Sequence, residues 1–337
     1  MRRILVTGGA GFIGSNFVRM ALSEHQDCFI VNLDKLTYAG NLENLSGFLS
    51  RPKHKFIKGD ICDGGLIEKI IDEHKIDVII NFAAESHVDR SIAEPKVFIE
   101  TNVTGTLTLL EAARDKKLER FIQISTDEVY GALGPAGKFS ETMPLSPNSP
   151  YSASKAAADH LVKAFGHTWG LKYNITRCSN NYGPYQFPEK LIPLMINNAL
   201  NDKALPVYGD GLYVRDWLYV QENCTAIWKV LTGAKPGEIY NIGGCNEKTN
   251  LEVIGLILKR LGRPESLIKH VKDRPGHDRR YATDATKIIR ELDWQSSVSF
   301  EEGISKTIDW YLQNQKWLNG VTSGDYQKYY ELMYERR

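Results

Sequence analysis

Tyr151 and Lys155 are the residues whose types and spacing most directly indicate chemistry. They stand four positions apart in Tyr-Ser-Ala-Ser-Lys, so a helix would place both on one face. A free phenol has a pKa of about 10 and is a poor base at neutral pH. A nearby ammonium favours the phenolate, so the pair predicts a base that removes a proton from a hydroxyl group. An ordinary turn of surface helix is the alternative.

Two adjacent carboxyl groups form a second candidate for chemistry. Asp127 and Glu128 follow an apolar run that is expected to be a buried strand. Neighbouring carboxyl groups push their pKa values apart, so one can stay protonated as an acid while the other acts as a base. Thr126 stands just before them, where it can hydrogen-bond a reacting hydroxyl group. A turn that carries solvated acids is the alternative.

A glycine-rich turn near the N-terminus predicts a phosphate-binding site. Gly8, Gly11 and Gly14 follow the expected first strand and open a helix, and Gly9 also fits as the first glycine of the pattern. Such glycines permit a tight turn, let the backbone approach a pyrophosphate and let the helix pack on the strand. The helix N-terminus offers unpaired N–H groups to phosphate. The turn therefore predicts a dinucleotide, with a cofactor-free turn as the alternative.

Asp34 indicates which dinucleotide is bound. It ends the expected second strand, 20 residues after Gly14. A carboxylate there accepts hydrogen bonds from ribose hydroxyls and repels a 2′-phosphate, so we expect NAD rather than NADP. Lys35 next to it leaves this preference open. The positive nicotinamide ring of NAD would join the lysine ammonium in favouring the phenolate of Tyr151.

The pattern of elements predicts an α/β fold of the Rossmann type, with a doubly wound parallel sheet. We expect residues 1–178 to form mainly the NAD-binding domain and residues 179–337 mainly a smaller C-terminal substrate-binding region, with some crossover of the chain. Residues 131–150, rich in Gly, Pro and Ser, predict a long loop. The expected strands are residues 4–7, 29–33, 56–58, 78–82, 121–125 and 173–178. The expected helices are residues 11–22, 65–74, 96–114 and 151–169.

Composition excludes several classes of protein. The 337 residues carry a formal net charge of +1, so no long-range field attracts nucleic acid or an anionic membrane. No apolar run reaches the roughly 18–20 residues that span a bilayer. The cysteines are scattered without a CxxC pair, so we expect reduced thiols in a cytoplasmic protein and no metal site. They are Cys28, Cys62, Cys178, Cys224 and Cys245.

Several motifs together resemble the extended short-chain dehydrogenase/reductase family, and within it the sugar-nucleotide 4,6-dehydratases. The resemblance covers nearly the whole chain. The acidic pair Asp127-Glu128 separates the dehydratases from related epimerases, which usually carry small or hydroxyl residues there. The matching motifs are TGGAGFIG, Asp60-Ile61, AAESHVD, STDEVYG, YSASK, CSNNYGPYQFPEKLIP, VRDWLYV, EIYNIGG and DRPGHDRRY.

The resemblance implies a mechanism for these residues. Tyr151 takes the proton of the sugar 4-hydroxyl while C4 gives hydride to NAD. Glu128 then removes the hydrogen on C5, Asp127 protonates the departing 6-hydroxyl, and hydride returns to C6. The implied reaction is dehydration of dTDP-glucose to a 4-keto-6-deoxy sugar nucleotide. The alternatives are a UDP-glucose 4,6-dehydratase, another UDP-sugar epimerase or decarboxylase, and a non-catalytic NAD-sensing module.

The resemblance also implies a homodimer, built from helices 96–114 and 151–169, and further contacts with both ligands. Arg215 and Arg274 suit a diphosphate on chemistry alone, with an ion pair of Arg215 to Asp210 or Asp216 as the alternative. The implied NAD contacts are Phe12, Ile13, Lys35, Thr37, Asp60, Ile61, Ala83, Ala84, Thr101 and Asn181. The implied sugar-nucleotide contacts are Ser86, Asn180, Lys190, Leu191, Pro206, Tyr208, Arg215, Asn250, Arg274 and His277.

Overall fold

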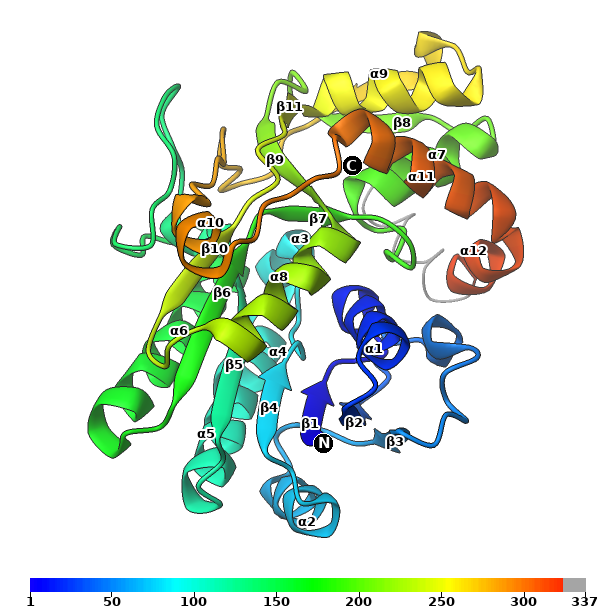
Figure 1. The fold of residues 1–337 in the computed structure, drawn as a ribbon. Helices are drawn as coiled ribbons and strands as arrows, with labels where there is room; N and C mark the ends of the chain where they lie inside the picture. The colour runs from blue at the N-terminus through cyan, green and yellow to red at the C-terminus, as the bar shows by residue number, and fades with distance from the viewer. Residues whose placement is uncertain (324–337) are drawn as a thin grey trace.

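A computed structural model describes residues 1–323, and a seven-stranded sheet forms its centre (Figure 1). Its strands are β1 (Arg2–Thr7), β2 (Cys28–Asp34), β3 (His54–Lys58), β4 (Val78–Asn81), β5 (Arg120–Thr126), β6 (Tyr173–Cys178) and β10 (Ile239–Ile242). They lie in the order β10-β6-β5-β4-β1-β2-β3, and all neighbours are parallel. Because β1 lies between β2 and β4, the chain winds outward from it in both directions, as in a doubly wound sheet.

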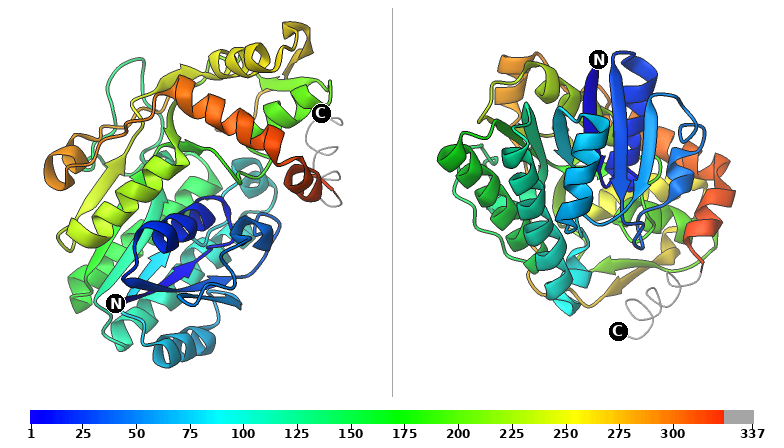
Figure 2. Two further views of the ribbon diagram at one scale, coloured as in Figure 1. Left: turned by 45° about the vertical axis from the view of Figure 1, so that its right-hand side comes forward. Right: turned by 90° about the horizontal axis from the view of Figure 1, so that it is seen from below.

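Helices cover both faces of this sheet (Figure 2). They are α1 (Phe12–Glu24), α2 (Gly64–His74), α5 (Thr106–Asp115), α6 (Pro150–Trp169), α8 (Val220–Gly233) and α10 (Thr286–Leu292). Strand β1 shows why its sequence is apolar throughout. Ile4 and Val6 belong to the core with α1 and α8, whereas Leu5 belongs to the core with α2, α5 and α6. Successive side chains point to opposite faces, and both faces are buried. The predicted fold class is confirmed.

The predicted strands and helices of the first half are confirmed to within a few residues, except that residues 96–114 are not one regular helix. They form α4 (Pro95–Phe98), a π-helical stretch (Ile99–Gly105) and α5. The Asn102 side chain in this stretch accepts a hydrogen bond from the N–H of Glu85 and donates to its carbonyl oxygen and to the Ser154 hydroxyl. The wider turn thus ties the segment after β4 to helix α6. Apolar periodicity carries no signal for such side-chain bonds.

The long loop predicted at residues 131–150 is confirmed, and its last residues cap the N-terminus of helix α6. Phe139 in the loop forms an isolated bridge with Thr283 and stacks on Tyr130, with ring centroids 5.0 Å apart. At the end of the loop, Ser149 caps α6 by accepting a hydrogen bond from the N–H of Ser152. The helix therefore begins at a fixed place.

The second half of the chain builds a region beyond the carboxyl ends of the main strands, at the top of Figure 1. It has its own apolar core and two small sheets, β11-β9-β7 and β12-β8. The chain returns to the main sheet with α8, which packs against it, and with β10, which is its edge strand. Residues 324–337 lie outside the described part. The elements of this region are β7 (Asn180–Tyr182), α7 (Leu191–Leu200), β8 (Leu205–Tyr208), β9 (Val214–Tyr219), β11 (Glu247–Thr249), α9 (Asn250–Leu261), β12 (Ile268–Val271), α11 (Phe300–Gln313) and α12 (Gln315–Val321).

No helix within residues 1–323 combines the length and the apolar character needed to cross a membrane.

Candidate active site

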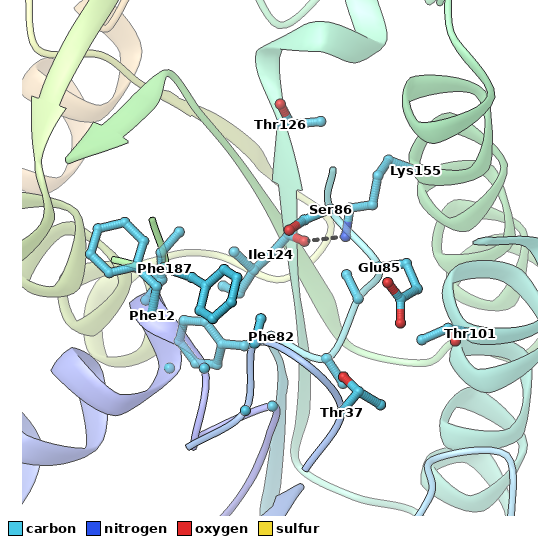
Figure 3. A pocket seen from close by; sticks show the side chains of 18 of the residues that line it. Phe12, Thr37, Phe82, Glu85, Ser86, Thr101, Ile124, Thr126, Lys155 and Phe187 are labelled. Carbon is cyan, nitrogen blue, oxygen red and sulfur yellow. Dashed lines mark hydrogen bonds between the residues drawn. The ribbon is translucent and has the colours of Figure 1, made fainter. Parts of the chain in front are cut away.

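A cavity of about 350 Å³ lies where the carboxyl ends of the main strands meet the second region. Phe12, Phe82 and Phe187 form an apolar wall on one side of it, across from Lys155 and Glu85 (Figure 3). The structure brings most of the predicted residues together around this cavity. They are Gly8, Gly11, Phe12, Ile13, Gly14, Asp34, Lys35, Thr37, Asp60, Ile61, Ala83, Ala84, Ser86, Thr101, Thr126, Asp127, Glu128, Tyr151, Lys155, Asn180, Asn181 and Lys190.

The three glycines of the turn serve different purposes. Gly8 has φ +70°, and a Cβ there would lie 2.6 Å from the backbone nitrogen of Ala83. A Cβ on Gly14 would lie 2.3 Å from the carbonyl oxygen of Gly8, so this glycine lets α1 pack on the turn. A Cβ on Gly11 would meet the Gly8 carbonyl oxygen at 3.3 Å, with no other atom within 4 Å, and Gly11 lines the cavity. Gly11 therefore leaves room for a ligand to approach the backbone.

Asp34 at the end of β2 is buried and held by the backbone. Its Oδ2 accepts a hydrogen bond from the N–H of Ala10 at 2.9 Å, and its Oδ1 accepts one from Leu36 at 2.8 Å. Burial raises its pKa, while these N–H groups oppose the rise. Each carboxylate oxygen can accept further bonds, so ribose hydroxyls remain suitable partners. The Lys35 ammonium lies 2.7 Å from the Asp60 carboxylate. Because this ion pair already uses the positive charge of Lys35, the arrangement favours NAD, whose ribose carries no 2′-phosphate.

Tyr151 and Lys155 lie on the buried face of α6, as their spacing predicts. Tyr151 is 8% exposed and Lys155 is 4% exposed. The Lys155 ammonium donates a hydrogen bond to the Ile124 carbonyl oxygen at 2.6 Å (Figure 3). Burial raises the pKa of Tyr151 well above its usual value, and the nearby Glu128 carboxylate raises it further. Burial is the largest influence on this pKa in the protein alone. The expected phenolate depends on the lysine ammonium together with the positive nicotinamide ring of NAD, so it stays a prediction.

The acidic pair is fixed by a 3₁₀ turn (Asp127–Tyr130) directly after β5. Thr126 caps this turn, since its hydroxyl oxygen accepts a hydrogen bond from the N–H of Glu128 at 3.2 Å. The same hydroxyl lies 3.3 Å from Asp127 Oδ1, and the Thr283 hydroxyl lies 3.4 Å from Asp127 Oδ2. Asp127 is 2% exposed and Glu128 is half-buried, so the alternative of a turn with solvated acids is wrong for Asp127.

The two carboxyl groups have different electrostatic surroundings. Burial raises the pKa of Asp127 well above its usual range, and the neighbouring Glu128 and Asp216 carboxylates raise it further. Burial also raises the pKa of Glu128, but the positive charges of Arg274 and Lys190 oppose that rise. Of the two, Asp127 is thus better suited to hold a proton, and Glu128 is the better candidate for a base.

Arg215, predicted as a phosphate ligand, lies outside the cavity lining but close to the acidic pair. It is 6% exposed, donates hydrogen bonds to the Val214 and Asp278 carbonyl oxygens, and lies 4.3 Å from the Tyr281 ring centroid. Asp210 pairs with another side chain, Arg279, at 2.7 Å. The alternative of a surface ion pair for Arg215 is therefore wrong.

The other predicted substrate residues outside the cavity lining are Leu191, Pro206, Tyr208, Asn250, Arg274 and His277. Arg274 lies 3.7 Å from Asp89, whose Oδ2 accepts a hydrogen bond from the Tyr208 hydroxyl at 3.2 Å. The rings of Tyr208 and His277 meet edge-on at 6.1 Å. Burial lowers the pKa of His277 to about 3, so this histidine is neutral at physiological pH. Leu191 is the first residue of α7, and Asn250 is the first residue of α9. Pro206 is the second residue of β8.

Several residues that line the cavity have no role predicted from the sequence. Glu189 is the most notable of them, because it is 4% exposed and burial raises its pKa. Its place beside Lys190 in a motif of the resembled family was the available signal. The other cavity residues without a predicted role include Phe82, Glu85, Val97, Cys178, Gln186 and Phe187.

Comparison with known proteins identifies the family. The profile of the family described as GDP-mannose 4,6 dehydratase matches residues 5–307. The chain belongs to this family. The dTDP-glucose 4,6-dehydratase of Xanthomonas campestris pv. campestris (strain B100) is 56% identical over 341 residues, which cover 96% of this chain and 97% of the relative. The predicted resemblance to sugar-nucleotide dehydratases is thus confirmed.

Solved structures agree with the sequence comparison. The dTDP-glucose 4,6-dehydratase of Bacillus anthracis str. Ames, in complex with NAD, has a TM-score of 0.90 and 51% identity, covering 95% of this chain and 100% of that one. DesIV of Streptomyces venezuelae, a dTDP-glucose 4,6-dehydratase with NAD bound, has a TM-score of 0.92 and 50% identity, covering 95% of this chain and 99% of that one. The second region is therefore shared with these relatives as well as the Rossmann-type sheet.

The raised pKa of Asp127 predicts a pH-dependent gain in stability for Asp127→Asn. A carboxyl whose folded pKa is raised binds its proton more tightly in the folded state, so wild-type stability falls as the pH rises toward that pKa. The uncharged amide removes this loss. Urea unfolding between about pH 5 and about pH 8 should show a variant more stable than wild type, with a gain that grows with pH. A gain independent of pH would contradict the assignment.

Proposed function

We propose that the protein dehydrates dTDP-glucose to the 4-keto-6-deoxy sugar nucleotide, with NAD as a cofactor that is regenerated in each turnover. The observation that carries the proposal is the meeting of Tyr151 with the Asp127–Glu128 pair at one cavity, where Tyr151 and Asp127 are buried. An epimerase needs the tyrosine but has no use for an acid and a base that expel water. The curated relatives named dTDP-glucose 4,6-dehydratase support the same reaction.

NAD fits the part of the cavity formed by the N-terminal turn. Gly11 leaves space for a pyrophosphate at the start of α1, and Asp34 presents a carboxylate to a ribose. Phe12 and Phe82 offer an apolar wall for a flat ring. When bound, NAD supplies a hydride acceptor for C4 of the sugar and a positively charged ring beside the phenol.

Tyr151 acts as the base in the oxidation. Its oxygen takes the proton of the sugar 4-hydroxyl as hydride leaves C4, and the alcohol becomes a ketone. Thr126 holds the reacting hydroxyl group, because its own hydroxyl lies at the end of β5 beside the cavity. Lys155, fixed on the Ile124 carbonyl oxygen, stands one helical turn from Tyr151.

Glu128 and Asp127 divide the elimination between them. The ketone acidifies the hydrogen on C5, and Glu128 takes it as a proton. The C6–O bond breaks as Asp127 gives its proton to the departing hydroxyl, so that water leaves. Hydride then returns to C6, and Glu128 returns the proton to C5. Asp127 ends without its proton and Tyr151 with one extra, so a proton passes between them before the next turnover.

The nucleotide and diphosphate occupy the second region. Arg215 and Arg274 bind the diphosphate, and Asn250 and the ring of Tyr208 bind the base. The positive charges of Arg215 and Arg274 lower the pKa of Glu128. This supports a substrate that lies between the two arginines and the acidic pair. The remaining predicted contacts are Ser86, Asn180, Lys190, Leu191, Pro206 and His277.

The protein works as a homodimer in the cytoplasm. The contact between subunits is formed by α6 and by residues 95–115, which comprise α4, the π-helical stretch and α5. Exposed apolar side chains on these helices support this, since Ile99 is 49% exposed and Trp169 is 53% exposed. The unpaired thiols of all five cysteines are consistent with a reducing compartment.

A comparison of nucleotide sugars tests the proposal directly. The purified protein is incubated separately with dTDP-glucose, UDP-glucose and GDP-mannose, and the products are analysed by mass spectrometry. We expect loss of one water from dTDP-glucose, at the highest kcat/KM of the three. Isomerisation of a UDP-sugar without change of mass would contradict the dehydratase assignment. Retention of NAD without turnover of any sugar would indicate a binding module instead.

Replacement of Glu128 by Gln should separate oxidation from elimination. The variant keeps Tyr151, so dTDP-glucose should still reduce the bound cofactor, which rapid mixing detects by its near-ultraviolet absorbance. Loss of water should slow by about 10²–10⁴-fold, the usual contribution of a positioned base. Tyr151→Phe is the matched variant, and it should show neither cofactor reduction nor product. Full activity of Glu128→Gln would contradict the assigned role.

A further inference from the structure

Three side chains from separate segments meet in a closed triangle near the cavity. The Tyr38 hydroxyl donates a hydrogen bond to Glu189 Oε1 at 3.0 Å, and Arg90 Nε donates one to Glu189 Oε2 at 3.1 Å. The Arg90 guanidinium also lies over the Tyr38 ring, 3.8 Å from its centroid. The Glu189 side chain is only 2% exposed. We call this arrangement the Tyr38–Glu189–Arg90 clasp.

Each member of the clasp lines the cavity or lies within a few residues of a residue that does. Tyr38 lies in the segment that follows β2, Arg90 lies in α3 (Val88–Ala93), and Glu189 precedes α7. The Tyr38 ring also meets the Phe187 ring edge-on, with centroids 5.7 Å apart. The cavity-lining neighbours are Thr37 and Ala39 beside Tyr38, Phe187 and Lys190 beside Glu189, and Ser86 ahead of Arg90.

The segment of residues 35–41 is tied to the Rossmann-type side at both ends. The N–H of Leu36 donates to Asp34 Oδ1 at 2.8 Å, and the N–H of Asn41 donates to the Ala10 carbonyl oxygen at 3.0 Å. Between these anchors, Tyr38 reaches to Glu189, just ahead of the second region. The segment therefore runs from the cofactor-binding turn toward the sugar side of the cavity and is fastened there by the clasp.

We propose that the Tyr38–Glu189–Arg90 clasp closes the cavity over bound NAD and controls how fast the cofactor leaves. This inference rests on the proposed function, which supplies NAD as the occupant. Release requires residues 35–41 to separate from Glu189, and separation takes hydrogen-bond donors from a buried carboxylate, which is costly. Retention serves the reaction, because a cofactor lost after the oxidation would leave the sugar as a ketone with no hydride to return.

Dissociation of labelled NAD tests the clasp. Wild-type protein and variants are loaded with radiolabelled NAD, chased with excess unlabelled NAD, and sampled over time for retained label. Tyr38→Phe removes only the hydroxyl and should release NAD about 10-fold faster or more, the effect expected for a lost hydrogen bond to a charged group. Arg90→Lys keeps the charge but loses the planar fork and the stacking, and it should also accelerate release.

Tyr240→Phe is the matched control. Its hydroxyl, on β10, donates to Glu291 Oε2 on α10 at 3.1 Å, and neither residue lines the cavity, so release should stay at the wild-type rate. Release from both clasp variants at the wild-type rate would overturn the clasp, even with normal turnover. Wild-type protein that retains NAD without dehydrating dTDP-glucose would overturn the proposed reaction and leave the clasp standing. Wild-type protein that retains no labelled NAD would overturn both.

Discussion

Burial of the ionisable groups is the constraint on which the rest of the site depends. Desolvation is the largest influence on the pKa values of Tyr151, Lys155, Asp127 and Glu128. It makes the phenol a weaker acid than it is in water, and it raises the pKa of the aspartate well above its usual range. It also lowers the local dielectric, so that one added positive charge has a large effect. A cationic ring bound beside Tyr151 would therefore lower the pKa of the phenol strongly.

The scaffold exists to hold these groups in fixed relation. Parallel strands place their carboxyl ends on one edge of the sheet, so β5 delivers the acidic pair beside the helix that carries the tyrosine. A buried network joins these two elements. Arg177 on β6 donates to Asp159 of α6 at 2.9 Å and to the Tyr130 hydroxyl at 2.8 Å. Tyr130 ends the acidic turn, so a shift of either element would leave a buried charge without its partner.

The sequence predicts the local parts of this site and misses the long-range ones. Turn glycines, strand ends and the four-residue spacing of Tyr151 and Lys155 are local patterns, and the structure places them as expected. The bond of Lys155 to the Ile124 carbonyl oxygen is a tertiary contact, as is the clasp on Glu189. The direction of the pKa shift at Tyr151 also has no local signal in the sequence, because it depends on how deeply the folded chain buries the phenol. The π-helical turn has the same origin in side-chain contacts across the fold.

A titration of the Tyr151 phenol tests whether a positive charge on the cofactor lowers its pKa. Ultraviolet difference spectra, with Tyr151→Phe as the reference, report its ionisation in protein saturated with NAD and in protein saturated with NADH. We expect the phenolate to appear at a lower pH with NAD, because only the oxidised nicotinamide carries a positive charge. The same titration midpoint with both cofactors would contradict it.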